Sequence, residues 1–434
     1  MDKTRHECDV LVVGGGPAGL AAACSAAQAQ VRVTIIDDNP GLGGQIWREE
    51  QRKQSAPDAE EWFKKVRDAK VERINGAKIF DFPEAGVLRA EASGGVYELS
   101  YHTLILATGA RERFLPFPGW TLPNVMGAGG LQAMVKSGVS IIGKKVVVAG
   151  SGPLLLAVAA YLREQGADLR LIAEQAPRRR LVPVGLALCR HPRKLLQLVT
   201  LEKQLLGVRY LTSCWPVAAE GDKKLRTITL RQGSKTWSLA CDYLACGFHL
   251  VANTELAALL DCELREGVVR VGDFQETSVD QVYCAGEATG IGGLELSIVE
   301  GQIAGYAATR QNAKAQALFA ARTKLRRLAL KMDRAFQLRD ELKNLPRPET
   351  IVCRCEDITL EQLQTQPSWN SAKMLTRCGM GPCQGRICGS AVEFLFHWIP
   401  KSVRPPIFPV RLDSLASTSG VPESRKASSV EGEL

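Results

Sequence analysis

The sequence lacks the features that would assign the protein to a membrane, a secretory route or a nucleic acid. No apolar run approaches the roughly 18 residues that suggest a transmembrane helix, and the opening residues, MDKTRHECD, are too polar for a signal peptide. Aromatic residues make up only 6% of the chain, so no stacking platform for nucleic acid is evident despite a formal net charge of +9. We therefore expect a soluble, cytoplasmic protein whose basic surface is solvated or docks an acidic partner.

Histidine is also scarce, whereas cysteine is abundant. The five histidines share no motif, and we interpret them as structural, so the sequence identifies no catalytic residue. The 13 cysteines stand in a chain without a secretion signal. This predicts reduced core thiols together with a metal or redox site, and it argues against a disulfide framework.

A G-x-G-x-x-G motif near the start organises the chain, because a strand, a helix and a second strand surround it in the required order. It follows the apolar run VLVV. Gly14 permits the tight turn, Gly16 lets the backbone approach a pyrophosphate, and Gly19 lets the next helix pack closely on the sheet. That helix begins at Pro17 and Ala18, with its N-terminus toward the phosphates.

Acidic and glycine residues after this unit extend the expected nucleotide site. Asp37 ends the second strand, where a carboxylate can accept a hydrogen bond from a ribose hydroxyl, and Asp38 is its close rival. Gly43 and Gly44 then suit a second close approach of the backbone to the nucleotide, although a flexible turn is the plainer alternative. A further buried strand is predicted at residues 103–107.

Residues 144–174 repeat the opening unit, so a second dinucleotide-type fold is expected within the chain. Gly150 and Gly152 are present, but Leu155 replaces the third glycine and should hold the helix further from the strand. Glu174 could hold a ribose here. Whether this second site binds NAD(P), ATP or ADP, or nothing, stays open.

Residues 277–305 are expected to return to the first domain. A short strand runs into Gly286 and Glu287, and a glycine turn and a helix follow. A carboxylate at a strand end, before a helix N-terminus, suits the ribityl chain and phosphate of a flavin.

Five of the 13 cysteines lie between residues 353 and 388. Their C-x-C and C-x4-C-x4-C spacing, among glycines, favours an iron–sulfur cluster held by four thiolates. A zinc site and unliganded thiols are the alternatives. Cys353 and Cys355 form one pair, and the second pair must come from Cys378, Cys383 and Cys388.

The glycine loops, LILATGARE and TSVDQVYCAGEATG together resemble the two-dinucleotide-domain flavoproteins, of which glutathione reductase is a familiar member. The resemblance implies an α/β fold with two Rossmann-like domains and FAD extended across the first. It places the ring near Gly43, Gly44 and Gln45, and the ribityl contact at Glu287, where the family usually has Asp. Further FAD contacts are implied at Ala107, Thr108, Gly109 and Gly286. No redox dithiol stands beside either glycine loop, so disulfide reduction is not expected.

The cysteine region, with CRCEDIT and TRCGMGPCQGRIC, resembles the bacterioferritin-associated-ferredoxin-like (BFD-like) [2Fe–2S] domain. This resemblance favours Cys353, Cys355, Cys383 and Cys388 as ligands, with Cys378 as the alternative. Residues 9–411 as a whole resemble the α-type subunit of multisubunit amine and amino-acid dehydrogenases, a family that includes the A-type subunit of opine oxidase, hydrogen cyanide synthase and dye-linked proline or hydroxyproline dehydrogenases. The family implies two partners: a glycine-oxidase-like FAD subunit, together with a small ferredoxin-like [2Fe–2S] subunit.

We therefore expect an electron-transfer subunit that passes electrons from a C–N bond toward a quinone, a dye or dioxygen, with peripheral contact to the quinone pool. A self-contained NAD(P)H-dependent flavoprotein reductase is the alternative, and a non-enzymatic scaffold is a third interpretation. The expected division of the chain is an FAD domain at 1–123 and 247–312, an inserted dinucleotide-like domain at 124–246, a helical connector at 313–348, a BFD-like domain at 349–411 and a disordered tail at 412–434.

Overall fold

The computed structural model describes residues 3–47, 57–189, 191–399 and 403–418. Its first half is built on a seven-stranded sheet in the order β3-β2-β1-β6-β5-β4, with β19 also paired to β6. The strands β1 (Lys3–Val13), β2 (Val33–Asp37), β3 (Glu72–Asn75), β6 (Gly95–Leu106) and β19 (Val282–Cys284) run parallel. The strands β4 (Lys78–Glu84) and β5 (Val87–Ala92) extend the sheet in antiparallel pairing.

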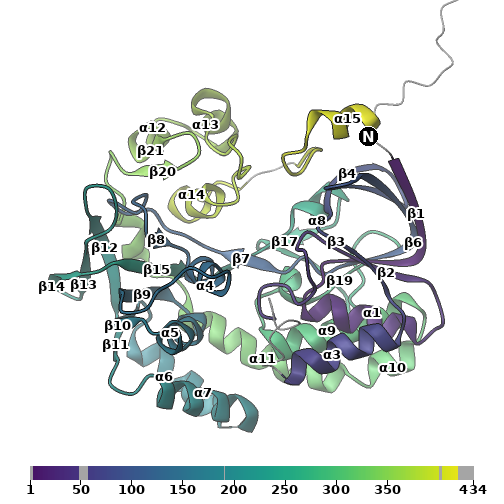
Figure 1. Ribbon diagram of the computed structural model, residues 1–434, viewed down its shortest axis with the longest axis horizontal. Coiled ribbons are helices and arrows are strands. Elements are labelled where there is room, and N and C mark those ends of the chain that lie inside the picture. The colour runs from purple at the N-terminus through teal and green to yellow at the C-terminus, as the bar shows by residue number, and fades with distance from the viewer. Residues whose placement is uncertain (1–2, 48–56, 190, 400–402, 419–434) are drawn as a thin grey trace, which may run out of the picture.

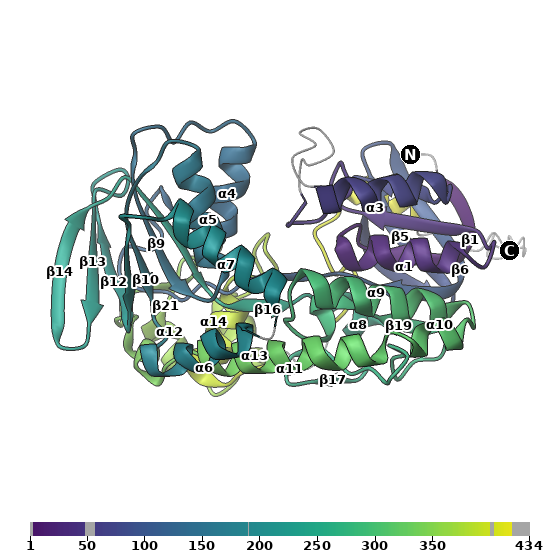
Figure 2. The same cartoon turned by 90° about the horizontal axis from the view of Figure 1, so that it is seen from below.

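The apolar run of β1 is buried on both faces, as a parallel strand covered by two layers requires. One face carries the helices α1 (Pro17–Ala27), α3 (Pro57–Asp68) and α9 (Leu294–Ala308), which lie together in Figure 2. The helices α1 and α9 approach closely because α9 has glycines at the contact. A Cβ on Gly301 would lie 2.1 Å from the Ala18 carbonyl oxygen, and one on Gly305 would lie 2.1 Å from that of Ala22.

The second half is the expected repeat. A parallel sheet in the order β11-β10-β9-β15-β8 is formed by β8 (Val125–Met126), β9 (Lys145–Ser151), β10 (Asp168–Glu174), β11 (Arg209–Thr212) and β15 (Tyr243–Phe248). Helices α4 (Ala128–Lys136) and α5 (Leu154–Glu164) pack on one face. An antiparallel sheet of β12 (Cys214–Glu220), β13 (Thr227–Gln232) and β14 (Lys235–Ala240) packs on the other. The helices α6 (Arg178–Leu188) and α7 (Pro192–Gln204) complete this half.

Two strands form the crossing between the halves. β7 (Ala110–Glu112) leaves the first half, and β16 (Leu250–Ala252) returns to it as the antiparallel partner of β7. The fold is therefore the expected α/β arrangement, in which one dinucleotide-type unit is inserted into another. α8 (Glu255–Leu259) follows the return.

The helical connector is divided into α10 (Asn312–Gln316), α11 (Phe319–Phe336) and the 3-10 helix η2 (Asp340–Asn344). Figure 2 shows α11 extending from the α9 side of the first half to α6 of the second. The C-terminal unit is built from β20 (Ile351–Cys353), β21 (Ile358–Thr359), α12 (Leu360–Gln364), α13 (Trp369–Thr376) and α14 (Cys388–Phe396). It lies above the second half in Figure 1, and the chain then crosses to the first half.

The expectation of a disordered tail from residue 412 is wrong for its first residues, because α15 forms at Leu412–Thr418. The buried hydroxyl of Ser414 donates to Glu91 Oε1 at 2.6 Å, and Arg411 pairs with the same carboxylate at 3.0 Å. A polar segment is thus held by one acid on β5, which composition alone does not reveal. Residues 419–434 of the expected tail lie outside the described residues.

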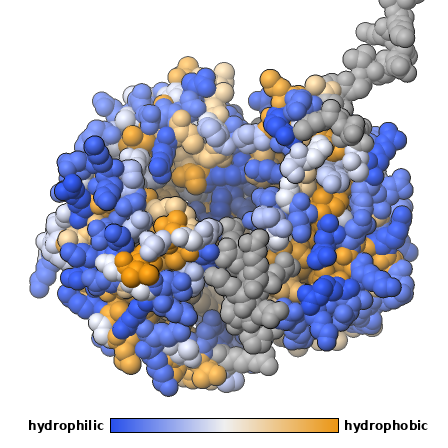
Figure 3. Space-filling model, in the orientation of Figure 1, coloured by the Kyte–Doolittle hydropathy of each residue, from blue (hydrophilic) through white to orange (hydrophobic). Residues whose placement is uncertain are grey.

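Within the described ranges, no helix is both long and apolar enough to cross a bilayer. The face drawn in Figure 3 is mainly hydrophilic, with apolar side chains gathered in separate small groups.

Candidate functional site: a glycine cradle and a thiol cluster

The first glycine loop has a geometry that only residues without a side chain can adopt. Gly14 has φ +108°, and a Cβ on it would lie 2.2 Å from the carbonyl oxygen of Ala107. A Cβ on Gly19 would lie 1.8 Å from the carbonyl oxygen of Gly14. Gly16 is the N-cap of α1, no side chain caps it, and Pro17 occupies the first turn. The N-terminus of α1 therefore presents N–H groups directly over the loop, where anionic groups are favoured.

The second glycine turn forms the opposite wall. The N–H of Gly43 donates to the carbonyl oxygen of Gly15 at 2.8 Å, which ties the two turns together. A Cβ on Gly44 would lie 2.9 Å from the Cα of Gly16. Gly43 and Gly44 have φ of +116° and +59°, and the next residue, Gln45, is exposed. The two turns form a cradle with backbone walls, which fits an extended pyrophosphate better than a side-chain ligand.

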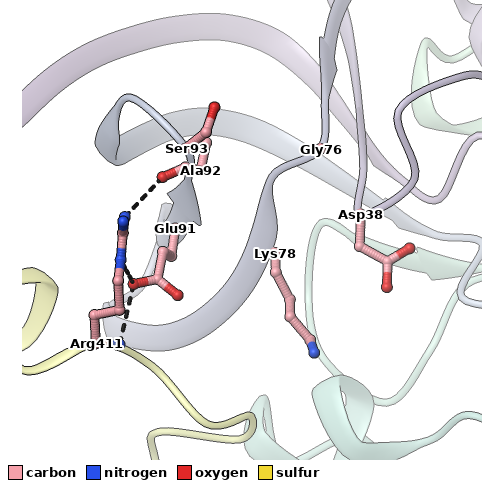
Figure 4. A pocket seen from close by; sticks show the side chains of 7 residues that line it. All are labelled: Asp38, Gly76, Lys78, Glu91, Ala92, Ser93 and Arg411. Atoms are coloured by element: carbon pink, nitrogen blue, oxygen red, sulfur yellow. Dashed lines mark hydrogen bonds and ion pairs between the residues drawn. The ribbon is translucent and has the colours of Figure 1, made fainter.

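The two acids after β2 lie in different surroundings. Asp37 is buried; its Oδ2 accepts from the N–H of Gly15, and its Oδ1 accepts from the N–H of Asn39 at 2.7 Å. Asp38 is exposed and lines a different cavity of about 330 Å³, together with Lys78, whose side chain lies beside it in Figure 4. Asp37 thus bonds the glycine loop, whereas Asp38 lines this separate cavity.

The floor of the cradle comes from two strand ends. The Thr108 hydroxyl donates to the carbonyl oxygen of Asn253 at 2.6 Å, and the Asn253 side-chain amide returns a bond to the Thr108 carbonyl oxygen at 2.9 Å. Gly109, with φ +67°, follows directly. At the other strand end, a Cβ on Gly286 would lie 2.7 Å from the Cβ of Ala18, so this turn abuts the first turn of α1.

A buried acid that sequence reasoning missed supports this second turn. Glu300, on α9, accepts from the Gly286 N–H at 3.2 Å and from the Thr289 hydroxyl at 3.1 Å, and it pairs with Arg326 at 2.8 Å. Burial raises the pKa of Glu300, and the nearby Arg326 opposes this rise. Burial also raises the pKa of the neighbouring Glu287. Glu300 lies within a helical run and carries no motif, so no sequence signal separated it from a surface acid.

In the second repeat, an acid after the second strand again accepts a hydrogen bond from the glycine loop, as Asp37 does in the first repeat, and this acid is more deeply buried. The Oε2 of Glu174 accepts from the Gly152 N–H at 2.9 Å, and its Oε1 accepts from the Ala176 N–H at 2.8 Å. Glu174 is 0% exposed, and burial raises its pKa to about 7. Gly150 is required because a Cβ there would lie 1.8 Å from the Gly247 carbonyl oxygen. Leu155, which replaces the third glycine of the motif in this repeat, is buried in the core.

The five C-terminal cysteines converge in the small domain. The sulfur atoms of Cys353, Cys378 and Cys388 lie within 4.8 Å of one another, and all three residues are buried. Cys383 is hydrogen-bonded to both Cys388 and Cys355, and Cys355 is the exposed member of the group. A Cβ on Gly381 would lie 2.3 Å from the Cβ of Cys355, so a glycine is needed beside this thiol.

Mutual hydrogen bonding divides these thiols into donors and acceptors. Bonds from Cys378 and Cys388 lower the pKa of Cys353 to about 2, and a bond from Cys388 lowers that of Cys383 to about 5. The bond to Cys353 raises the pKa of Cys378 to about 12, and bonds to Cys353, Cys378 and Cys383 raise that of Cys388. A compact set of sulfur donors has the chemistry of a soft-metal or iron–sulfur site. Cys378 lies inside this set, so geometry alone does not separate it from Cys388.

A continuous set of hydrogen bonds joins the cradle to the thiols. Arg111, on β7, donates from one terminal nitrogen to Asn253 Oδ1 at 2.7 Å and from Nε to the Arg386 carbonyl oxygen at 3.2 Å. The side chain of Arg386 donates to the Cys383 carbonyl oxygen at 3.4 Å. Since Asn253 is bonded to Thr108, the path runs from the floor of the cradle to the cysteine loop.

Glu255, at the start of α8, lies between the two arginines, 3.0 Å from Arg111 and 3.8 Å from Arg386. The indole N–H of Trp120 adds another contact between the units, because it donates to the carbonyl oxygen of Ile351 at 2.6 Å. Sequence reasoning assigned no role to these residues, although Arg111 and Arg386 stand inside the quoted segments LILATGARE and CQGRIC.

Comparisons with known proteins agree with this geometry. The family model of pyridine nucleotide-disulphide oxidoreductases matches residues 8–317. The A-type subunit of opine oxidase from Agrobacterium tumefaciens is 31% identical, over 96% of this chain and 93% of that protein. Hydrogen cyanide synthase subunit HcnB of Pseudomonas protegens is 31% identical, over 87% of this chain and 89% of that protein.

Among solved structures, L-proline dehydrogenase from P. horikoshii superposes with a TM-score of 0.68 at 20% identity, over 96% of this chain and 80% of that chain. Thioredoxin reductase from T. acidophilum superposes with a TM-score of 0.55 at 20% identity, over 71% of this chain and 99% of that chain. These two likenesses establish the fold.

Proposed function

The chain belongs to the pyridine nucleotide-disulphide oxidoreductase family, within the group that contains HcnB and the A-type subunit of opine oxidase, and we propose that it is an electron-transfer subunit. In this proposal it holds FAD and a [2Fe–2S] cluster within a hetero-oligomeric dehydrogenase or oxidase. The complex acts on the C–N bond of an amino acid or opine, of the proline, hydroxyproline, glycine or opine type.

One observation carries the proposal: the glycine cradle and the thiol cluster occur in one chain and are joined through Arg111 and Arg386. The cradle residues fit FAD, because glycine backbone walls and an uncapped helix N-terminus suit a pyrophosphate. The expected contacts are Gly14, Gly16, Pro17, Ala18, Gly19, Asp37, Gly43, Gly44, Gln45, Ala107, Thr108, Gly109, Gly286 and Glu287.

When bound, FAD accepts two electrons and releases them singly, whereas a [2Fe–2S] cluster takes one at a time. The chain's own contribution is to hold the two sites at a fixed separation. Thr108 and Asn253 hold the cradle floor, and Arg111 fixes it to the cysteine loop. We propose Cys353, Cys355, Cys383 and Cys388 as the cluster ligands, with Cys378 as the alternative.

The proposal assigns substrate oxidation to a separate glycine-oxidase-like FAD subunit. The histidine contacts support this division. In the described ranges, His6 bonds Thr34, His249 lies 3.4 Å from Asp333, and His397 lies 3.5 Å from Lys343. None of these partners belongs to the cradle, so none of these three histidines is placed there as a substrate base. The two relatives named above are subunits, which supports a hetero-oligomer. In the proposal, a small ferredoxin-like subunit completes the complex and passes electrons to a quinone, a dye or dioxygen.

The alternative, a self-contained NAD(P)H-dependent reductase, requires the second glycine loop to bind a nucleotide. Glu174 has no exposed surface, and backbone N–H groups engage both of its oxygens. Asp37 is engaged in the same way in the first repeat, so these hydrogen bonds do not distinguish the two loops. Mixing the purified chain anaerobically with NADH or NADPH tests the point, because rapid flavin bleaching without a partner would favour the reductase.

The proposed function is tested by co-purifying the chain with its natural partners under anaerobic conditions. Visible spectra and iron analysis should show flavin and two irons per chain. Proline, hydroxyproline, glycine and opines are then supplied one at a time. Reduction of both centres by one of these compounds supports the proposal, and a complex that none of them reduces contradicts the substrate class.

A further inference from the structure

A cleft of about 520 Å³ lies between α11 and the adjoining ends of α6 and α7, and none of the residues assigned above lines it. Its floor is apolar, because Ala187 and Leu328 are buried. Its rim carries His191 and the exposed cations of α11. Figure 2 shows α6 and α7 on the same side of the molecule as α11, so the cleft lies where the two halves meet.

The charged residues that line the cleft are all cationic. Lys324, Arg327 and Lys331 stand three and four residues apart on α11, so they share one face of the helix, and among the described residues no carboxylate lines the cleft with them. Like charges at this spacing disfavour a helix. Within the described residues, none of the three takes part in an ion pair or a side-chain hydrogen bond.

Two arginines of the same helix are paired with acids. Arg322 pairs with Asp273 at 2.9 Å, and Arg326 pairs with Glu300 at 2.8 Å. The helix therefore satisfies its charges where it packs against the first half. The three cations that border the cleft keep an uncompensated positive charge.

The opposite wall adds to the positive potential. His191 caps α7, and its surroundings contain Lys324, Lys194 and Lys331 together with one acid, Glu295. That acid is already paired with Lys194 at 3.5 Å. Burial and these lysines lower the pKa of His191, so the neutral imidazole can donate or accept a hydrogen bond beside the cations.

We propose that this cleft binds a small molecule that carries a phosphate group. The guanidinium of Arg327 offers paired donors for phosphate oxygens, and Lys324 and Lys331 supply point charges on either side. The apolar floor accommodates an uncharged body attached to the phosphate. The volume falls within the range of about 300–1,000 Å³ that is typical of ligand pockets. This site is independent of the proposed electron relay, since it uses none of its residues.

Isothermal titration of the full chain with pyrophosphate, at constant ionic strength, tests the proposal. The triple variant K324Q/R327Q/K331Q should bind at least about tenfold more weakly, because it loses charge-assisted hydrogen bonds. The control K223Q/K224Q/K235Q removes the same charge from exposed residues of the β12–β13 loop and of β14, and it should bind like the parent chain. Equal weakening in both variants, or none in either, would overturn the site.

Two further arms test the ligand class. Citrate and a poly-glutamate peptide replace pyrophosphate in separate titrations. Selective binding of pyrophosphate supports a phosphate site, whereas equal or tighter binding of citrate or poly-glutamate overturns it in favour of a carboxylate site or an acidic protein. The single variant R327Q guards against misfolding of the triple variant: it should keep the parental thermal melting curve and still lose affinity.

Discussion

The substitution Gly44→Ala tests the cradle most sharply, because the structure shows what the added methyl group would meet. Its Cβ would lie 2.9 Å from the Cα of Gly16, well inside the ordinary carbon–carbon contact of about 3.5–4.0 Å. The second glycine turn must therefore move away from the first. Overpacking of this kind costs about 1–3 kcal/mol, so FAD should bind roughly 5- to 150-fold more weakly.

The matched control is Gly76→Ala. Gly76 has φ +67°, close to the +59° of Gly44, but a Cβ there would have nothing within 4 Å. Both variants therefore bear the cost of a left-handed alanine, about 1 kcal/mol, and only Gly44→Ala changes the cradle. Flavin titration of deflavinated protein measures the two affinities. Equal affinity in the two variants would refute the assignment of these turns to FAD.

Three further predictions address the thiols, the bridge and the second repeat. Cys388→Ser should lose most of its iron, and Cys378→Ser should keep its iron. Iron analysis after anaerobic purification measures both. The reverse pattern would move the ligand assignment from Cys388 to Cys378. Arg111→Met removes a charge-assisted bond of about 1.5–3 kcal/mol to the cysteine loop, so the small domain should become more sensitive to protease. Unaltered protease resistance would contradict the bridge. Burial raises the pKa of Glu174 from 4.5 to about 7. Between these pH values the folded state retains a proton that the unfolded chain releases. The free energy of unfolding should therefore fall by up to about 3 kcal/mol as pH rises from 4.5 through 7. Urea unfolding at pH 5 and pH 8 should show a smaller decline in Glu174→Gln than in the parent chain. The same pH dependence in the variant and the parent chain would contradict this role of Glu174.

Much of the fold could be predicted because its signals are local. The apolar run before Gly14, the glycine spacing and the repeat at Gly150 each lie within a short segment, and the structure forms the expected strand, turn and helix at both places. The second glycine turn was harder to interpret, since Gly44 is explained only by its contact with Gly16.

The parts that could not be predicted depend on contacts distant in sequence. Arg111 and Arg386 are 275 residues apart, and no pattern in either segment indicates the bond between them. Ser414 is held by Glu91 across 323 residues, so a polar composition was wrongly interpreted as disorder at the start of α15. Sequence reasoning identified the cysteines but not their connection to the cradle.

The central claim is that one chain carries electrons between a flavin and a thiol-bound cluster. Rapid mixing of the anaerobic complex with its reducing substrate, followed by freezing and electron paramagnetic resonance, tests it directly. We expect a reduced [2Fe–2S] signal to appear in the parent complex and to be lost, with the iron, in Cys388→Ser. A complex that turns over with no paramagnetic iron at any time would contradict this claim.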